Sequence, residues 1–407
     1  MSDTILIKVT GKDKPGLVSS ITTIMADYGL EVLDIDQSVI HDILTLGVIV
    51  RLPDGDTAAP VLKALRFYCH RSGLKFNDQP VSLHGYEHRV LEQDKNRYIL
   101  TLLSRKVTVE HIARVSGITA SYGLNIDHIT RLSGCGSLNK DVSCSTQPSC
   151  LKFSVQGSPP DLHRLQKEFL HLGEELDIDV VFQKDSIYRH HRRLVVFDMD
   201  STLIEAEVID LLAEAAGVGA KVAEITERAM QGEIDFDQSF CERLGMLKGL
   251  DESVLATIAE QLPLTEGAEY LIQTLRALGY RTAILSGGFT YFANYLKQTL
   301  GIDYVYANEL DIVNGKVTGQ VFGDIVNGQR KADLLKQLAA KEGILLDQVI
   351  AVGDGANDLP MLSVAGLGIA FRAKPRVKQS ARHAISTLGL DSILYLLGLS
   401  ESDLQSL

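Results

Sequence analysis

Residues 194–202, LVVFDMDST, decide the fold of the C-terminal half of this chain. Four apolar residues run directly into acids and hydroxyls, as a buried strand does at the edge of a sheet. The same pattern returns in TAILSGG (282–288) and in VIAVGDGAND (349–358). Amphipathic helical patterns separate these runs, and alternating strands and helices are typical of a parallel α/β sheet. The sequence therefore predicts a Rossmann-like domain over residues 185–407.

The polar ends of these strands should form one site, because ligands of open α/β sheets bind beyond the carboxyl ends of the strands. The site would hold four carboxylates, a hydroxyl, glycine-rich backbone and an ammonium group from GQRKADLLKQL. So many carboxylates repel one another unless a cation lies among them, and oxygen ligands beside a phosphate favour Mg²⁺. With that metal, a carboxylate can attack phosphorus. The side chains are Asp198, Asp200, Asp354, Asp358, Ser286 and Lys331.

Each of these motifs alone has a simpler explanation. A strand-terminal Asp is often a helix cap, a Gly-Gly pair is usually a turn, and a single Lys is usually solvated. Together and in this order, however, DMDST, SGG, the downstream Lys and GDGAND resemble the four motifs of the haloacid dehalogenase superfamily of phosphatases. The combination favours catalysis over a structural explanation.

The resemblance implies a role for each carboxylate. Asp198 would take the phosphoryl group as an aspartyl-phosphate, and Asp200 would protonate the leaving oxygen and then activate water. The metal would bind Asp198, Asp354 and the main-chain carbonyl of Asp200, with Asp358 close beside it.

The resemblance also implies how the phosphoryl group is held. Ser286 and the neighbouring N–H groups of Gly287 and Gly288 would bind its oxygens, and Lys331 would neutralise the nucleophile and the transferring group. Positioning and electrostatic stabilisation supply most of the catalysis in phosphoryl transfer.

About eighty residues separate the first and second motifs, far more than a βα connection needs. Their helical patterns predict a cap over about 206–272 that closes over the site and excludes water. This segment resembles phosphoserine phosphatases, in which a Glu meets the substrate ammonium and an Arg grips its carboxylate. The matching residues are Glu207, Met230, Phe236 and Arg243, with Asn357 as a further contact to substrate or phosphate. The alternative is surface pairing for Arg243 and core packing for Met230 and Phe236.

The resemblance implies hydrolysis of L-phosphoserine to L-serine and phosphate, the last step of serine synthesis. One rival is a phosphatase of broader specificity, acting on phosphoproteins or other small phosphates, and another is phosphoryl transfer to an alcohol. A rival of a different class is an amino-acid-sensing protein with a decayed catalytic module, which the complete set of motifs argues against.

An internal repeat precedes the catalytic region. Residues 5–35 match 99–129 at an offset of 94, which pairs Ile5 with Ile99. Each copy continues in a βαββαβ order, as in ferredoxin-like folds. This order and the turn KDKPGL (12–17) resemble the ACT domain, a module that binds amino acids. We expect ACT domains over 1–87 and 95–184.

The turn of the first copy could bind an effector such as serine. Asp13, Pro15 and Gly16 precede a helix whose free N–H groups would attract a carboxylate, although a helix cap that binds nothing is equally possible. In the second copy Val109 and Glu110 replace the Pro-Gly pair, which makes ligand binding less expected there. The open sheet edges of both copies favour a homodimer.

Composition limits the partners and the compartment. A net charge of -12 argues against nucleic-acid binding, and neither a signal peptide nor a membrane span is evident. Five cysteines without a CxxC pair favour the cytoplasm. We interpret the segment with Cys135, Cys144 and Cys150 as a polar loop, and residues 185–193 (DSIYRHHRR) as a solvated linker.

Overall fold

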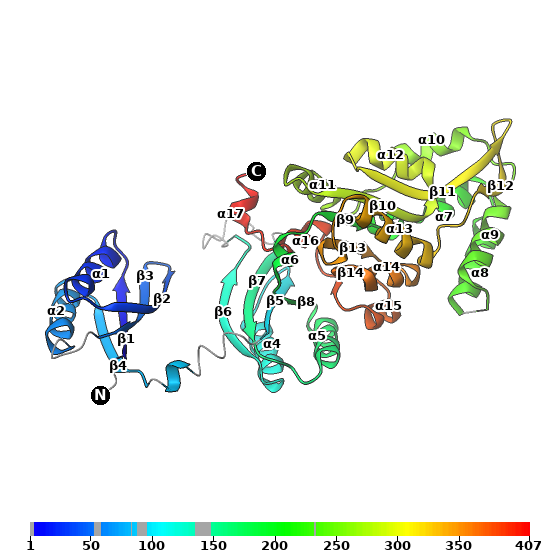
Figure 1. Ribbon diagram of the computed structural model, residues 1–407. Coiled ribbons are helices and arrows are strands. Elements are labelled where there is room, and N and C mark those ends of the chain that lie inside the picture. Colours follow the sequence, from blue (N-terminus) through cyan, green and yellow to red (C-terminus); the bar gives the residue numbers. More distant parts are fainter. Residues whose placement is uncertain (1–3, 53–57, 83, 88–95, 135–147, 232) are drawn as a thin grey trace, which may run out of the picture. The chain divides into compact units, whose positions relative to one another are not determined.

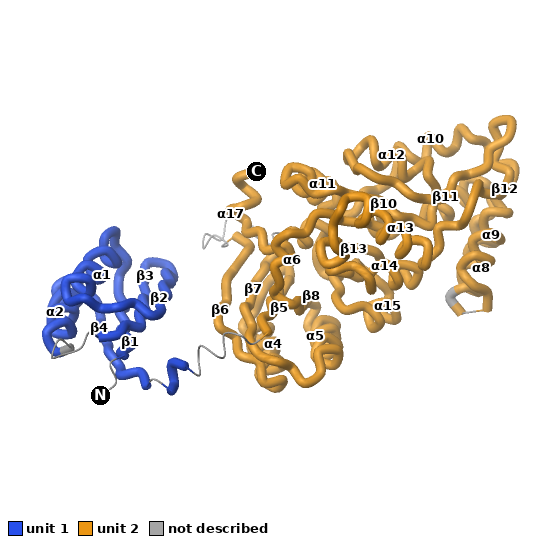
Figure 2. Tube along the Cα trace, in the orientation of Figure 1, with its two compact units in different colours: residues 1–95 blue, residues 96–407 orange. Residues whose placement is uncertain are grey.

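The structure, a computed structural model, describes residues 4–52, 58–82, 84–87, 96–134, 148–231 and 233–407. The chain divides into two compact units, residues 1–95 and 96–407 (Figure 2). The first unit holds the first repeat, and the second unit holds both the second repeat and the catalytic sheet. Within the described residues, no helix combines the length and apolarity that crossing a membrane requires.

The first unit has the predicted βαββαβ order (Figure 1). Its antiparallel sheet has the strand order β2-β3-β1-β4, and α1 and α2 bury the apolar side chains of one face. Strand β2 lies at an edge and exposes several apolar side chains, among them Val32, Ile35 and Ile40. The elements are β1 (Thr4–Lys12), α1 (Leu17–Asp27), β2 (Glu31–Ile40), β3 (Ile43–Arg51), α2 (Ala58–Arg71) and β4 (Lys75–Pro80).

The second repeat has the same topology, with the strand order β6-β7-β5-β8. Helices α4 and α5 cover one face of this sheet. The elements are β5 (Arg97–Ser104), α4 (Val109–Ser121), β6 (Asn125–Arg131), β7 (Ser149–Gln156), α5 (Leu162–Leu176) and β8 (Asp179–Lys184).

The constant offset of 94 between the repeats is wrong in their first strands. Ile5 packs beneath the helices of its repeat, whereas in the second repeat Leu100 does so and the adjacent Ile99 points to the other face. The offset is correct where the first helices end, because Gly29 and Gly123 match there with φ values of 68° and 69°. The offset also holds inside the helices, since the buried Ile21 and Met25 of α1 match the buried Val115 and Thr119 of α4; with 13 residues against 11, α4 only begins two residues earlier.

The catalytic region is a seven-stranded sheet in the order β12-β11-β10-β9-β13-β14-β15. All neighbours are parallel except β11 and β12, as the alternating pattern predicts. The strands are β9 (Leu194–Phe197), β10 (Arg281–Phe289), β11 (Tyr304–Val313), β12 (Lys316–Phe322), β13 (Val349–Gly353), β14 (Leu367–Phe371) and β15 (Ala384–Ile385).

Helices cover both faces of the sheet, because alternate residues of each strand point to opposite sides. Val195 and Phe197 face α11 and α12, whereas Leu194 and Val196 face α13 and α14. The other helices that follow the strands of this sheet are short. The helices are α11 (Ala268–Ala277), α12 (Thr290–Leu300), α13 (Gly328–Lys341), α14 (Leu359–Val364), α15 (Pro375–Ser380), α16 (Ile393–Leu396) and α17 (Glu401–Leu404).

Between β9 and β10 lies a helical insertion, which we define as residues 206–262. The chain enters and leaves it through two extended segments joined by an antiparallel bridge between Ile204 and Leu264. Helix α11 follows the second segment and contacts β10 and α12. The helices of the insertion are α7 (Val208–Ala215), α8 (Gly219–Gln231), α9 (Phe236–Met246) and α10 (Ser253–Glu260).

The second repeat packs against the catalytic sheet through the face that its own helices leave uncovered. Leu103, Cys150 and Val181 belong to the same apolar core as α16. Asp179 on β8 accepts hydrogen bonds from the main-chain N–H groups of Ser386 (2.8 Å) and Thr387 (2.9 Å). The second repeat is therefore built into the catalytic unit.

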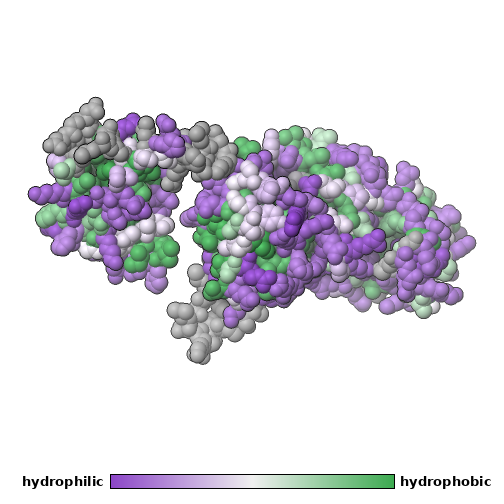
Figure 3. Space-filling model, turned by 90° about the horizontal axis from the view of Figure 1, so that it is seen from below, coloured by the Kyte–Doolittle hydropathy of each residue, from purple (hydrophilic) through white to green (hydrophobic). Residues whose placement is uncertain are grey.

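This packing corrects two expectations from the sequence. Cys150 is a buried residue of strand β7 and not part of a polar loop, and burial raises the pKa of its thiol. Cys135 and Cys144 lie outside the described residues. The linker forms a short helix, α6 (Ile187–His190), and is only partly solvated, because Arg189 and Arg192 are just 3% and 5% exposed. Elsewhere the visible surface of this unit is mostly hydrophilic (Figure 3).

Candidate active site

Strand β9 delivers Asp198 to the carboxyl edge of the sheet. Oδ1 of Asp198 accepts a hydrogen bond from the N–H of Met199 (2.7 Å), which begins a wide, non-helical turn (Met199–Leu203) closed by the N–H of Ile204 donating to the carbonyl of Met199 (3.1 Å). Within this turn Ser201 has φ 54°, a left-handed conformation that is rare outside glycine. The turn leads from the strand to Asp200, whose carboxylate is near enough to Lys331 and Asp354 to feel their charges.

Helix α13 brings a buried ammonium group to the same point. Asn327 caps the helix by accepting a hydrogen bond from the N–H of Arg330 (3.1 Å), and Lys331 follows in the first turn. Nζ of Lys331 lies 2.8 Å from Asp198 Oδ1 and 2.7 Å from Asp358 Oδ1. Burial alone would lower the pKa of Lys331, but the two carboxylates raise it.

Asp198, Asp354 and Asp358 form a group that could hold a metal ion among the described residues, with one oxygen from each within 4.8 Å of the others. Burial and the neighbouring carboxylate of Asp358 raise the pKa of Asp198 well above its ordinary value and raise the pKa of Asp354 to about 7. Three carboxylates share one ammonium group here. An all-oxygen site with this excess of negative charge fits Mg²⁺.

Asp200 lies between the catalytic sheet and the helical insertion. Its Oδ1 accepts a hydrogen bond from the N–H of Val208 (2.9 Å) at the start of α7, and its Oδ2 lies 3.5 Å from Oγ of Ser286. Burial and the nearby Glu207 raise the pKa of Asp200 to about 7. A Cβ on Gly288 would lie 2.5 Å from Asp200 Oδ2, so this position needs glycine.

A residue that the sequence analysis missed connects the end of β10 to the segment before α13. Asn308 on β11 donates from Nδ2 to the carbonyl of Gly287 (2.8 Å) and accepts at Oδ1 from the N–H of Val326 (2.9 Å). Ser286 is buried, and its Oγ accepts from the N–H of Gly288 (2.8 Å). A lone Asn in a strand gives no recognisable sequence signal for this role.

The predicted pocket residues reach this edge from the helical insertion. The ring of Phe236 lies so close to Gly287 that a Cβ there would be 3.0 Å from its Cζ. Glu207 accepts a hydrogen bond from Ser201 Oγ (2.7 Å). Burial lowers the pKa of Arg243, while the negative charge of Glu207 acts in the opposite direction. Glu207 and Arg243 are thus near enough for their charges to interact, and Nε of Arg243 donates to the carbonyl of Ser239 (3.3 Å). The side chain of Met230, on α8, lies outside the described part of the chain.

Two asparagines, Asn357 and Asn327, lie near Gly287 and near α9, respectively. Asn357 belongs to the short turn Ala356–Asp358, and its Nδ2 is 3.9 Å from the position of a Cβ on Gly287. Asn327 donates from Nδ2 to both carboxylate oxygens of Asp237 on α9 (3.2 and 3.1 Å). This contact, which the sequence analysis missed, joins the helical insertion to the helix that carries Lys331.

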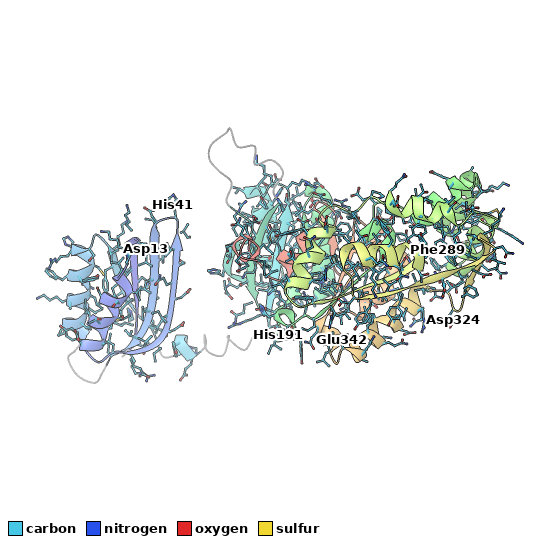
Figure 4. All side chains as sticks on the ribbon, turned by 90° about the horizontal axis from the view of Figure 1, so that it is seen from above. Asp13, His41, His191, Phe289, Asp324 and Glu342 are labelled. Carbon is cyan, nitrogen blue, oxygen red and sulfur yellow. The ribbon has the colours of Figure 1, made fainter. Side chains whose placement is uncertain are left out.

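The predicted effector turn lies in the first unit. Gly16 begins α1 with φ 88° and without a side-chain cap, and the N–H of Asp13 donates to the carbonyl of Asp42 (2.7 Å), beside His41 (Figure 4). Pro15 is exposed between them.

In the second repeat helix α4 begins two residues earlier than the offset of 94 predicts, so Thr108 has the N-cap position that Gly16 has in the first. Thr108 and His111 form a reciprocal capping box, each bond 3.3 Å long. These side chains occupy main-chain N–H groups that a ligand would need.

Comparison with known proteins supports the same division of the chain. Residues 195–363 match the family model of haloacid dehalogenase-like hydrolases, and residues 3–78 match that of the ACT domain. A phosphoserine phosphatase of Streptomyces coelicolor is 38% identical over 99% of this chain and 94% of its own length. The chain belongs to the phosphoserine phosphatase family.

Other members of the phosphoserine phosphatase family show similar coverage. A phosphoserine phosphatase of Mycobacterium tuberculosis is 37% identical over 99% of this chain and 95% of its own length. Among solved structures, a probable phosphoserine phosphatase of Vibrio cholerae is 35% identical, covers 78% of this chain and 90% of its own, and superposes with a TM-score of 0.57. The relatives thus extend across the repeats as well as the catalytic region.

Proposed function

We propose that this enzyme hydrolyses L-phosphoserine to L-serine and phosphate through an aspartyl-phosphate on Asp198. One observation carries the proposal: Asp198, Asp354 and Lys331 meet at the end of β9, and the charges of Glu207 and Arg243 on the helical insertion are near enough to interact. The first group has the charges that phosphoryl transfer needs, and the second has the two charges that complement an amino acid.

In the first step Asp198 attacks phosphorus. The described hydrogen bonds of Asp198 all go to Oδ1, so Oδ2 is the oxygen available to form the new P–O bond. The bond from phosphorus to the serine oxygen breaks, and Asp200 gives that oxygen a proton. A pKa of about 7 allows Asp200 to carry this proton at neutral pH.

In the second step Asp200 takes a proton from water, whose oxygen attacks the phosphorus. The bond between phosphorus and Asp198 breaks, and phosphate leaves. Lys331 keeps its charge beside Asp198 throughout. Ser286 and the N–H groups of Gly287 and Gly288 would hold the phosphoryl oxygens, with the N–H of Gly288 exchanging its bond to Ser286 Oγ (2.8 Å) for one to the phosphoryl group.

The carboxylates of Asp198 and Asp354 and the main-chain carbonyl of Asp200 would hold Mg²⁺, with Asp358 beside them. When bound, Mg²⁺ neutralises the excess negative charge, favours the ionised form of Asp198 and polarises the phosphoryl oxygens. Asp358 is already engaged by Lys331 and by the N–H of Gly355 (3.0 Å), which supports a position outside the metal's own ligands.

The substrate's amino-acid portion would lie between the sheet and the helical insertion. Glu207 would bind the ammonium group and Arg243 the carboxylate, with Phe236 and Met230 as walls and Asn357 near the phosphate. The contact between Asp237 and Asn327 holds α9 over the site, which supports a small substrate over a folded phosphoprotein.

We further propose that serine binds near Asp13, Pro15 and Gly16 and inhibits the enzyme, and that the enzyme is a cytoplasmic homodimer paired through its repeats. The uncapped start of α1 and the exposed apolar side chains of the edge strand β2 support these proposals.

Phosphate release from L-phosphoserine in the presence of Mg²⁺ tests the activity. We expect Asp198→Asn to abolish release and an excess of chelator to stop it. Hydrolysis that continues unchanged with the chelator would contradict the proposed chemistry.

The pocket is tested by comparing substrates. Glu207→Gln and Arg243→Met should each raise KM for L-phosphoserine on the order of tenfold or more, since each removes a charge-assisted hydrogen bond. Hydrolysis of an aryl phosphate, which lacks the amino-acid groups, serves as the control and should change far less. Preference for a phosphopeptide, or transfer of phosphate to homoserine, would favour the two rival activities.

A further inference from the structure

The helical insertion is attached to the sheet by two linkers, residues 203–205 and 263–266. Ile204 and Leu264 pair between them as an antiparallel bridge, and flanking main-chain hydrogen bonds of 2.9 and 3.0 Å join the two linkers on either side. Any movement of the insertion relative to the sheet changes the backbone angles of these residues, because the insertion has no other covalent connection to the sheet.

A single guanidinium holds both linkers. Arg372, which follows β14, donates from Nη1 to Oε1 of Glu205 (2.9 Å) and from Nη2 to Oε2 of Glu266 (2.7 Å). Its backbone has φ 42°, and its guanidinium lies 5.3 Å from the centre of the Phe371 ring. The planar fork of Arg372 thus fixes one carboxylate of each linker against the edge of the sheet.

The second repeat adds another guanidinium to the same carboxylate. Arg105 directly follows β5, and its Nη2 lies 3.2 and 3.1 Å from the two carboxylate oxygens of Glu266. The main-chain carbonyl of Glu266 also accepts a hydrogen bond from the N–H of Leu390 (2.8 Å). Glu266 is therefore the residue at which the repeat, the sheet and the linker meet.

The four side chains form one network, in the order Arg105, Glu266, Arg372 and Glu205. An isolated exposed ion pair contributes little, but a network that shares carboxylates between arginines contributes more. None of the four contacts the carboxylates of the proposed catalytic centre in the described structure. Their contribution therefore concerns the position of the linkers and not the chemistry.

We propose that Arg105 is a positioning residue through which the second repeat controls the opening and closing of the helical insertion. Its bond to Glu266 forms in the arrangement described here, so it favours this arrangement over others in which the linkers have moved. The proposal rests on the proposed function, since the insertion must open to admit phosphoserine. It assigns the second repeat a mechanical role that needs no ligand in that repeat.

The test compares Arg105→Ala with Arg114→Ala. Arg114 lies in the same repeat and forms an equally exposed pair with Glu175 (3.0 and 2.7 Å), but that pair stays within the repeat. Hydrogen exchange is measured at the amides of Glu205 and Thr265, which donate between the linkers. We expect roughly two- to fivefold faster exchange in Arg105→Ala and wild-type exchange in Arg114→Ala.

Two further measurements sharpen the result. Arg105→Lys, which keeps the charge, should restore part of the protection, and KM for phosphoserine in Arg105→Ala should change by the same two- to fivefold factor. Once Glu266→Gln is present, Arg105→Ala should have little further effect. Wild-type exchange in Arg105→Ala, or equal acceleration in Arg114→Ala, would overturn the proposal. Exchange needs no substrate, so it decides this question even if phosphoserine proves not to be hydrolysed.

Discussion

Nζ of Lys331 lies 2.8 Å from Asp198 and 2.7 Å from Asp358, and all three side chains are buried. With Asp354 nearby, the carboxylates outnumber the ammonium group, and this imbalance leaves room for a divalent cation. Burial, reinforced by Glu207 at Asp200 and by Asp358 at Asp354, raises the pKa of each carboxyl to about 7. The electrostatics of the site follow from burial together with this shortage of positive charge.

We expect the replacement of Lys331 by Met to remove most of the phosphatase activity. The variant leaves Asp198 and Asp358 without their shared partner, and we expect kcat to fall on the order of 10³-fold, as when a preorganised electrostatic contact is lost. Steady-state phosphate release measures this. The matched control is Lys336→Met, because Lys336 lies on the same helix but is exposed and pairs with Asp333 (3.4 Å). A Lys331→Met enzyme with near wild-type kcat would show that this ammonium group does not act in the reaction.

At the scale of elements, the sequence predicted the site better than it predicted the contacts between elements. The ends of β9, β10 and β13 could be placed together because parallel strands share one carboxyl edge. Asn308 and the contact between Asp237 and Asn327 could not, because they join residues far apart in the sequence and have no motif. The constant repeat offset holds within the first helices and fails before them, where α4 begins two residues earlier than that offset predicts.

The burial of the basic linker, residues 185–193, is another feature that the sequence did not predict. Arg189 and Arg192 look like a solvated charge run, yet the second repeat and the sheet enclose them. Arg192 donates from Nη2 to Oε1 of Gln183 on β8 (2.8 Å). Burial of this kind depends on which surface packs against the linker, and local composition carries no information about that.

The contact between α9 and α13 makes a separate prediction. Asp237→Ala removes the acceptor of both Asn327 bonds, so the helical insertion should close less often and KM for the substrate should rise roughly tenfold, the size expected for a hydrogen bond to a charged group. Gln238→Ala is the control, because Gln238 bonds within the insertion to Glu242 (3.1 Å). Equal KM values for the two variants would argue against a role of this contact in closure.

At the scale of the molecule, the second repeat is part of the catalytic unit whereas the first repeat is a separate compact unit. The open face of the second sheet packs apolar side chains against α16, and Asp179 binds the chain after β15. The linker arginines and the network at Glu266 add polar contacts between the same partners. The two copies of one fold therefore differ in their packing. The first repeat is a separate unit, and the second repeat is a structural part of the catalytic unit.

The buried side chain of His383 predicts how the stability of the folded protein depends on pH. Burial and the positive charges of Arg192 and Arg382 lower the pKa of His383 to about 3, from about 6.5 in an unfolded chain. Between these values the unfolded chain binds a proton that the folded protein does not, so stability falls as the pH decreases. From pH 7 to pH 5 this one group should contribute a loss of about 2 kcal/mol.

Chemical denaturation at several pH values tests this expectation. His383→Gln should show a shallower loss of unfolding free energy below pH 6.5 than the wild type, whereas replacement of the exposed His163 should leave the wild-type slope. Identical slopes for wild type and His383→Gln would mean that this histidine is not kept neutral in the folded protein.

Truncation separates the roles of the two repeats. Deleting residues 1–95 removes one compact unit, so the remaining chain should keep its melting temperature and its kcat while losing any inhibition by serine. Deleting residues 1–184 exposes the apolar side chains around α16 and frees the N–H groups that Asp179 binds, so this variant should be less stable by several kcal/mol and prone to aggregation. Thermal melting and phosphate release of both truncations measure the difference. If the shorter chain proves as stable and as active as the longer one, the second repeat is dispensable to the catalytic unit, and its contacts with the sheet contribute nothing measurable.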